Sequence, residues 1–249
     1  MTATHTAHPL IRKLESIFTL TDEERDALVS LPMQVADLKA DQDVVREGDR
    51  PTRSFAILAG FACTFKIVGE GKRQIMAFHI PGDMPDLQSL HLTVLDISVG
   101  TITPCKVGFI RHETLHDLCG RYPRIASALW RQTLVDAAVF REWITNVGRR
   151  EGYSRLAHIL CELVTRMRAV GLAQDHTCDL PITQSELADA TGLTTVHVNR
   201  VLQELRGDEL IKLAGGTLTV LDWDGLKKAG DFDPTYLHLE QEQEQEQAA

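Results

Sequence analysis

Short apolar runs separated by glycines fill the segment from Gln34 to Ile110. The runs FAILAGFACTFKIV, RQIMAFHIPGD and CKVGFI are apolar or alternate between apolar and polar residues, and a turn signal recurs about every 8–12 residues. This pattern predicts a β-barrel or β-sandwich. Ahead of it, Thr21 stands three residues before Glu24 in TDEERDALVSL, which is a capping box and predicts a short helix leading into the strands.

After Pro123 the apolar residues take the mixed three- and four-residue spacing of a helix, without Gly or Pro until Gly148. This predicts one long helix, whose apolar content exceeds what a solvent-facing linker between two domains should carry. Its covering partner is either the same helix of a second chain or the strands of its own chain. The apolar positions are Ile125, Leu129, Leu134, Ala138, Phe140, Ile144 and Val147.

A second capping box, Thr183 and Glu186, begins the segment ITQSELADATGLTTVHVNRVLQELRGDELI. Two helices with a tight turn between them follow: Ala188 is small where helices approach closely, and Gly192 falls in the turn. Val198 and Val201 follow as buried positions of the next helix. This spacing is a helix-turn-helix signature, with a plain helical hairpin as the less specific alternative.

Thr194 can cap the second helix, so that Thr195, Val196, His197, Asn199 and Arg200 face outward. Arginine can pair with guanine, asparagine with adenine, and a valine or threonine methyl with the thymine methyl. Alternatively, Asn199 is an ordinary surface residue and Arg200 a phosphate clamp. The residues that we expect to contact DNA are Thr183, Gln184, Ser185, Thr194, Thr195, Val196, His197, Asn199, Arg200 and Gln203.

The segment LIKLAGGTLTVLD then predicts two short strands joined at Gly215 and Gly216, which would form the wing of a winged helix-turn-helix. The chain is therefore α+β. We place a strand-rich sensor domain at 12–120, a dimerisation helix at 121–148, the DNA-binding domain at 149–230 and a tail at 231–249. Since such readers favour dimers, the second chain is the preferred partner of the long helix.

The net charge of −9 is unusual for a DNA-binding protein, because phosphate contacts favour a positive surface. Part of this charge lies in the closing segment LEQEQEQEQAA, a low-complexity tract that we expect to be disordered. The sequence has no membrane-spanning apolar run and no signal peptide, so we expect a cytoplasmic protein. The five scattered cysteines are consistent with reduced thiols, most of them buried.

These segments resemble the Crp/Fnr family of bacterial transcription regulators over about residues 12–230. VVREGDRPTRSFAILAGFACTFKIVGEGKRQIMAFHIPGD is similar to the family's cyclic-nucleotide-binding β-roll, and the helix-turn-helix segment matches the family's reader. The resemblance implies a homodimer that binds double-stranded DNA, works with RNA polymerase and keeps a base-reading arginine at Arg200.

The chain also departs from the family pattern. Cyclic-AMP-binding members carry a Gly-Glu pair and an Arg-Ser pair after the PGD turn, whereas this chain has MPDLQSLHLTVLDISVGTITPC. A buried phosphate without such partners would not recover its lost hydration, so we do not expect cyclic AMP to bind. No cysteine precedes Cys63, which argues against the family's iron–sulfur cluster. Val196 replaces the family's common glutamate, so the operator should differ from the best-known one.

His112 to His116 spell H-E-x-x-H, a zinc-binding pattern when it lies on a helix, and Cys119 follows on the same face. The segment is short, so a metal site on His112, His116 and Cys119 is only a weak candidate, and solvated surface histidines are favoured. His79 and His91 raise haem as an equally weak candidate, and any single cysteine could act as a redox switch.

The sequence thus predicts a sequence-specific transcription regulator rather than an enzyme. Its homodimer would read an inverted repeat through the 194–206 helix, under a signal other than cyclic AMP. The effector-binding residues cannot be assigned. The alternatives are a ligand- or metal-sensing module that acts through protein contacts, and a zinc hydrolase.

Overall fold

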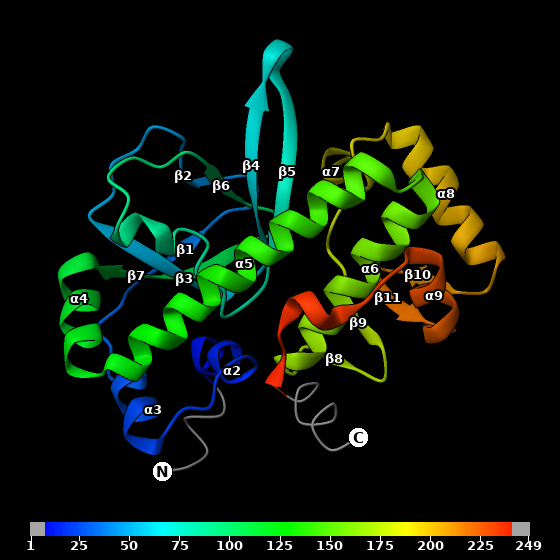
Figure 1. Ribbon diagram of the computed structural model, residues 1–249. Coiled ribbons are helices and arrows are strands. Elements are labelled where there is room, and N and C mark those ends of the chain that lie inside the picture. The colour runs from blue at the N-terminus through cyan, green and yellow to red at the C-terminus, as the bar shows by residue number, and fades with distance from the viewer. Residues whose placement is uncertain (1–7, 241–249) are drawn as a thin grey trace. The chain divides into compact units, whose positions relative to one another are not determined.

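The computed structural model describes residues 8–240 (Figure 1). Two compact units are present, which we describe separately. Unit 1 contains residues 1–66, 78–137 and 238–249, and unit 2 contains residues 67–77 and 138–237. The expected disorder of the Glu/Gln tract concerns residues that lie almost entirely outside the described range.

Seven strands form the predicted β-roll as two sheets. One sheet has the order β1-β7-β3 and the other β2-β6-β4-β5, and neighbouring strands with an assigned register run antiparallel. The prediction of a β structure between Gln34 and Ile110 is confirmed. The strands are β1 (Gln34–Leu38), β2 (Asp43–Val45), β3 (Arg53–Ala59), β4 (Ala62–Val68), β5 (Lys72–His79), β6 (Ser98–Thr101) and β7 (Cys105–Arg111).

Short helices accompany the roll and share its core. The capping box at Thr21 and Glu24 begins α3 as predicted, with both reciprocal hydrogen bonds present. A core cluster joins apolar side chains of these helices to the roll, including Leu14, Ala56 and Leu115, and continues into the first turns of the long helix. The helices of unit 1 are α2 (Pro9–Glu15), α3 (Asp22–Val29), the 3-10 turn η2 (Leu87–Leu90) and α4 (His112–Arg121). The 3-10 turn η1 (Gly69–Gly71), between β4 and β5, belongs to unit 2.

The predicted long helix is α5 (Pro123–Arg149), the long green helix of Figure 1. Its 27 residues give it a length of about 40 Å at the usual helical rise. Ile125, Leu129 and Ala138 are buried as part of its inner face, whereas Leu134 and Ile144 are exposed. The apolar positions therefore serve two different faces of the helix.

Unit 2 is built around α6, which is buried along most of its length. A sheet of order β10-β11-β9-β8 and the helices α7, α8 and α9 surround it. Gly215 and Gly216 both have positive φ angles, 59° and 80°, in the turn between β10 and β11, which confirms the predicted hairpin. The elements are α6 (Gly152–Ala169), β8 (Ala173–Gln174), β9 (Thr177–Asp179), α7 (Gln184–Thr191), α8 (Thr195–Gly207), β10 (Ile211–Ala214), β11 (Thr217–Val220), α9 (Trp223–Gly230) and the 3-10 turn η3 (Pro234–Leu237).

Two fully buried polar residues of α6 are held by hydrogen bonds. Glu162 accepts from Trp143 Nε1 at 2.9 Å and from the Tyr236 hydroxyl at 2.7 Å. His158 lies 3.1 Å from the Gly230 carbonyl oxygen and, through its other ring nitrogen, 3.1 Å from the same Tyr236 hydroxyl. These bonds offset the cost of burying polar groups and fix the segment after α9 against α6.

Among residues 8–240, no helix combines the length and the apolar character that crossing a membrane requires.

Candidate nucleic-acid interface

The two helices of the predicted reader begin at side-chain caps. Thr183 Oγ1 accepts from the Glu186 amide at 3.2 Å, and a Glu186 carboxylate oxygen accepts from the Thr183 amide at 2.6 Å. Gly192 ends α7 with φ 68°, a conformation that costs glycine little. Thr194 Oγ1 then accepts from the His197 amide at 3.2 Å and starts α8. Local sequence signals thus define both ends of the turn.

The small and branched apolar residues of the motif face the interior. Ala188, Val198 and Val201 are all buried, as the spacing predicted. Arg155 of α6 donates from Nη1 to the carbonyl oxygen of Thr191 at 2.7 Å, which satisfies a carbonyl group at the end of α7. Contacts with α6 therefore hold the helix pair on its inner side, and its outer side stays exposed and accessible to DNA.

The exposed surface of α8 carries the chemistry that suits the major groove. Val196 is 81% exposed, and Thr195, Arg200 and Gln203 are also exposed. Arg200 Nε lies 3.7 Å from Glu204 Oε1, one helical turn further on. The first turn of α8 contains no acidic residue. The positive end of the helix dipole is therefore not neutralised by a side chain of that turn.

Two residues that were predicted to read bases, Asn199 and His197, are less exposed than the sequence indicated. Asn199 is half-buried, donating to Gln184 Oε1 at 3.1 Å and accepting from Gln203 Nε2 at 3.1 Å. The chain of hydrogen bonds ties α8 to the start of α7. His197 is also half-buried, and a Cβ atom at Gly152 would come within 2.9 Å of its Nε2. Gly152 therefore makes room for this ring.

The remaining predicted contacts lie at the start of α7. Thr183 and Ser185 are exposed and Gln184 is half-buried. The hydroxyl of Thr183 is engaged in the capping box, donating to Glu186 Oε2 at 2.8 Å. The predicted contact residues thus fall on two neighbouring helix starts, while their contacts with DNA remain predictions.

Comparison with known proteins agrees with this geometry in both parts of the chain. A model of the Crp-like helix-turn-helix domain matches residues 154–229, and a model of the cyclic nucleotide-binding domain matches residues 35–122. The chain belongs to the Crp/Fnr family of DNA-binding transcription regulators.

Relatives and solved structures of the family cover most of the chain. The transcriptional activator protein FnrL of Cereibacter sphaeroides is 27% identical over 199 residues, 78% of this chain and 79% of FnrL. The fumarate and nitrate reduction regulatory protein of Vibrio cholerae is 25% identical over 205 residues, 82% of each chain. The structure of FixK2 from Bradyrhizobium japonicum superposes with a TM-score of 0.73 at 22% identity, covering 80% of this chain and 98% of FixK2. FnrL is named a transcriptional activator and the Vibrio cholerae protein a regulatory protein, which agrees with the class that the sequence predicted.

Buried carboxylates lie in the PGD turn and in the segment that follows it. Asp83 is 2.9 Å from Lys13 Nζ, and both side chains are buried. Asp86 accepts from the Phe55 amide at 3.0 Å through one oxygen, and its other oxygen has no hydrogen-bond partner. Burial raises the pKa of Asp86 to about 7.

The histidines of the H-E-x-x-H segment do not converge. His112 Nε2 lies 3.2 Å from the Ser54 hydroxyl and 3.0 Å from the Ser89 hydroxyl, so the interpretation of His112 as a solvated surface residue is wrong. His116 is exposed, and its ring packs edge-on near that of His91. Within the described residues, no group of three or more His, Cys, Asp or Glu side chains could hold a metal ion. His112, His116 and Cys119 therefore do not form the weakly predicted metal site.

The remaining candidate sensor residues, His79 and the cysteines, have the surroundings of residues that stabilise the fold. His79 is buried and lies 2.7 Å from the Thr64 hydroxyl, as expected for a histidine satisfied within the core. All five cysteines are free, and four are buried, which confirms that most are core residues. Cys119 is half-buried, and burial raises the pKa of its thiol. A raised thiol pKa lowers the fraction of reactive thiolate, which disfavours a redox switch here.

Proposed function

We propose that this regulator acts as a homodimer that reads an inverted-repeat operator through residues 194–206 and responds to a signal other than cyclic AMP. The main support for the reading role is the exposed N-terminal half of α8. Thr195, Val196 and Arg200 are exposed there, whereas Val198 and Val201 on the opposite side of the helix are buried. Val196, at 81% exposure, presents methyl groups that can contact a thymine methyl. With Val196 at this place, the operator differs from that of family members with glutamate.

The exposed face of α5 supports the dimer. Trp130, Leu134 and Ile144 are 69%, 56% and 73% exposed, although each is a large apolar residue. With Ala137 and Arg141 they occupy positions separated by four, three, four and three residues, which is the heptad spacing of a coiled-coil seam. A second α5 would cover this seam. It would also relate two α8 helices by a twofold axis, so that half-sites lie one helical turn of DNA apart.

Three properties of the β-roll support a signal other than cyclic AMP. The segment after the PGD turn lacks the Gly-Glu pair, lacks the Arg-Ser pair and carries the buried residue Asp86. A phosphate bound at this segment would find no arginine there to neutralise it. A metal site of His112, His116 and Cys119 is not proposed. RNA polymerase is proposed as the protein partner on the family resemblance alone.

The reading role is tested by selecting binding sites from random duplex DNA at fixed salt concentration. We expect an enriched inverted repeat with half-sites about 10 base pairs apart, centre to centre. Enrichment of a single half-site would contradict the dimeric reader. The absence of any enriched sequence would favour the alternative, a sensing module that acts through protein contacts.

The seam is tested with Ile144→Glu, measured by sedimentation equilibrium. A charged residue in an apolar seam should convert the dimer to monomers and reduce operator binding, while the far-ultraviolet circular dichroism stays unchanged. Thr145→Glu is the matched control, because Thr145 is exposed on the same helix but lies off the seam. A dimer that persists in Ile144→Glu would place the self-association surface elsewhere.

A further inference from the structure

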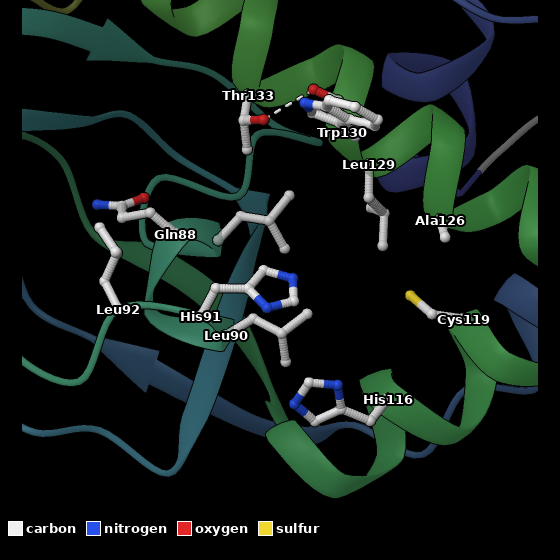
Figure 2. Close-up of a pocket in the computed structure, with 11 residues that line it drawn as sticks. Gln88, Leu90, His91, Leu92, His116, Cys119, Ala126, Leu129, Trp130 and Thr133 are labelled. Carbon is white, nitrogen blue, oxygen red and sulfur yellow. Dashed lines mark hydrogen bonds between the residues drawn. The ribbon is translucent and has the colours of Figure 1, made fainter.

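A cavity of about 520 Å³ lies between η2, α4 and the first half of α5, within unit 1. Figure 2 shows Leu90, Cys119 and Leu129 pointing into the same space from these three elements. None of the strands of the β-roll contributes a lining residue, so this cavity is separate from the roll interior. Its volume falls within the range of roughly 300–1,000 Å³ that is usual for small-molecule sites.

The lining has an apolar body and a polar edge. Leu87, Leu90, Ala126 and Leu129 form much of the body, together with the ring of Trp130. The polar edge contains two exposed imidazoles, those of His91 and His116, whose ring centroids are 5.8 Å apart at an interplanar angle of 72°.

The charges and hydrogen-bond donors at the polar edge indicate which kind of ligand the cavity can bind. The lining contains no Asp, Glu, Lys or Arg. A carboxylate at the edge would meet no acidic lining residue, and two imidazole rings can each present an N–H donor to it. An ammonium group would find no carboxylate in the lining. The apolar body excludes strongly hydrated molecules such as nucleotides, because their phosphates would have to give up water against leucine side chains.

We propose that this cavity binds a monocarboxylic acid with an apolar body, its carboxylate at His91 and His116 and its body against Leu90, Leu129 and Trp130. The binding rests on the cavity alone and does not require that the protein binds DNA. If the homodimer proposed above forms, Trp130 belongs to both the cavity and the α5 seam. A ligand there can then act on the dimer directly.

Octanoate serves as the probe, with octylamine as a probe of the same chain length and opposite charge. Binding is followed by the fluorescence of Trp130, with Trp130→Phe identifying that signal among the three tryptophans. A second readout is the rate at which iodoacetamide alkylates Cys119, the one cysteine that is not buried. We expect saturable binding of octanoate that slows alkylation, and affinity for octylamine at least about tenfold weaker.

Variants locate the two ends of the ligand. His91→Ala and His116→Ala should each weaken octanoate about tenfold, as expected for loss of one hydrogen bond to a charged group. His197→Ala, which removes a histidine from unit 2, should leave the affinity unchanged. Ala126→Phe places a large side chain in the cavity and should abolish binding, with a melting curve that shows the chain still folds.

Three results would overturn the proposal. The first is equal affinity for octanoate and octylamine, which would mean that the imidazoles recognise no charge. The second is octanoate binding that survives in folded Ala126→Phe, which would place the ligand elsewhere. The third is binding that appears only in the monomeric Ile144→Glu variant, which would assign the cavity to the second copy of the chain. All measurements are made without DNA, so failure of the DNA-reading proposal does not affect them.

Discussion

Two ion pairs, one in each unit, show how differently the β-roll and the reader use charge. Lys13 and Asp83 meet at 2.9 Å with side chains only 7% and 2% exposed. Arg200 and Glu204 lie 3.7 Å apart with side chains 66% and 49% exposed. The first pair has lost its water and depends on its partner, whereas the second keeps its water and can exchange its partner.

This difference in exposure distinguishes charged residues that stabilise the folded structure from charged residues that are available to a ligand. Near the PGD turn, the Lys13 ammonium and the Asp83 carboxylate hold each other in a buried ion pair. On α8, Arg200 is loosely held and can turn to DNA at little cost. Each of the following substitutions tests one side of this contrast.

Lys13→Met should have the largest effect, lowering the free energy of unfolding by about 3–5 kcal/mol, because it leaves the Asp83 carboxylate buried without its cation. Chemical denaturation measures this. Lys66→Met is the control in the same unit, since Lys66 pairs with Glu47 at 3.1 Å on the surface and should cost less than about 1 kcal/mol.

Adding Asp83→Asn to Lys13→Met should recover more than half of the loss, since the buried charge is then removed. Equal losses for Lys13→Met and Lys66→Met would mean that burial does not distinguish these pairs.

Local and tertiary signals explain which features the sequence could predict. The reader was predictable because a capping box, a turn glycine at Gly192 and the buried spacing of Val198 and Val201 all act within a few residues. The β-roll was predictable as a pattern of strands and turns.

Features that depend on distant segments could not be predicted. Asp86 is buried where its carboxylate accepts a hydrogen bond from the Phe55 amide, 31 residues earlier. His112 looked like half of a zinc motif, but its ring turns to Ser54 and Ser89, which lie on other elements. Gly152 accommodates the ring of His197, 45 residues further along the chain. The cavity beside Trp130 likewise requires three elements to be brought together. In each case, no periodicity in the sequence carries the information.

Asp86→Asn should change the pH dependence of stability. Burial raises the carboxyl pKa in the folded state from 3.8 to about 7. The folded state therefore binds the proton more tightly than the unfolded state. The contribution of Asp86 is most favourable below about pH 4 and decreases as pH rises to about 7.

Asparagine stays neutral throughout, so the variant should gain about 3–4 kcal/mol relative to the wild type between pH 4 and pH 7.5. Urea denaturation across this range measures the difference. Asp117→Asn, at an exposed carboxylate on α4, should follow the wild-type curve. Parallel curves for Asp86→Asn and the wild type would refute the assignment of this titration to Asp86.

Arg200→Ala should leave the free energy of unfolding within about 0.5 kcal/mol of the wild type, because the side chain is exposed and its ion pair is weak. Its effect should fall on DNA: about 1–3 kcal/mol of binding to the selected operator, with relaxed preference at one base pair of each half-site.

Binding to all single-base variants of the operator measures this preference. Arg206→Ala removes the same charge from the exposed last turn of α8 and should weaken all sequences alike. If Arg200→Ala also weakens specific and random DNA equally, Arg200 acts as a phosphate clamp and not as a base reader.

Glu204→Ala should have the smallest effect, tightening operator binding by less than about 1 kcal/mol. The substitution frees Arg200 from its exposed partner and removes a negative charge from the α8 surface that faces phosphates in the proposed complex. The gain should decrease as salt concentration rises, since exposed charges are screened. Asp224→Ala, at an exposed acid of α9 in the same unit, controls for the change in net charge. Weaker and less selective binding by Glu204→Ala would show the opposite role, in which the carboxylate holds Arg200 in its reading position. In that case the exposed pair would depend on its partner just as Lys13 and Asp83 do, and the contrast between the two units would not hold.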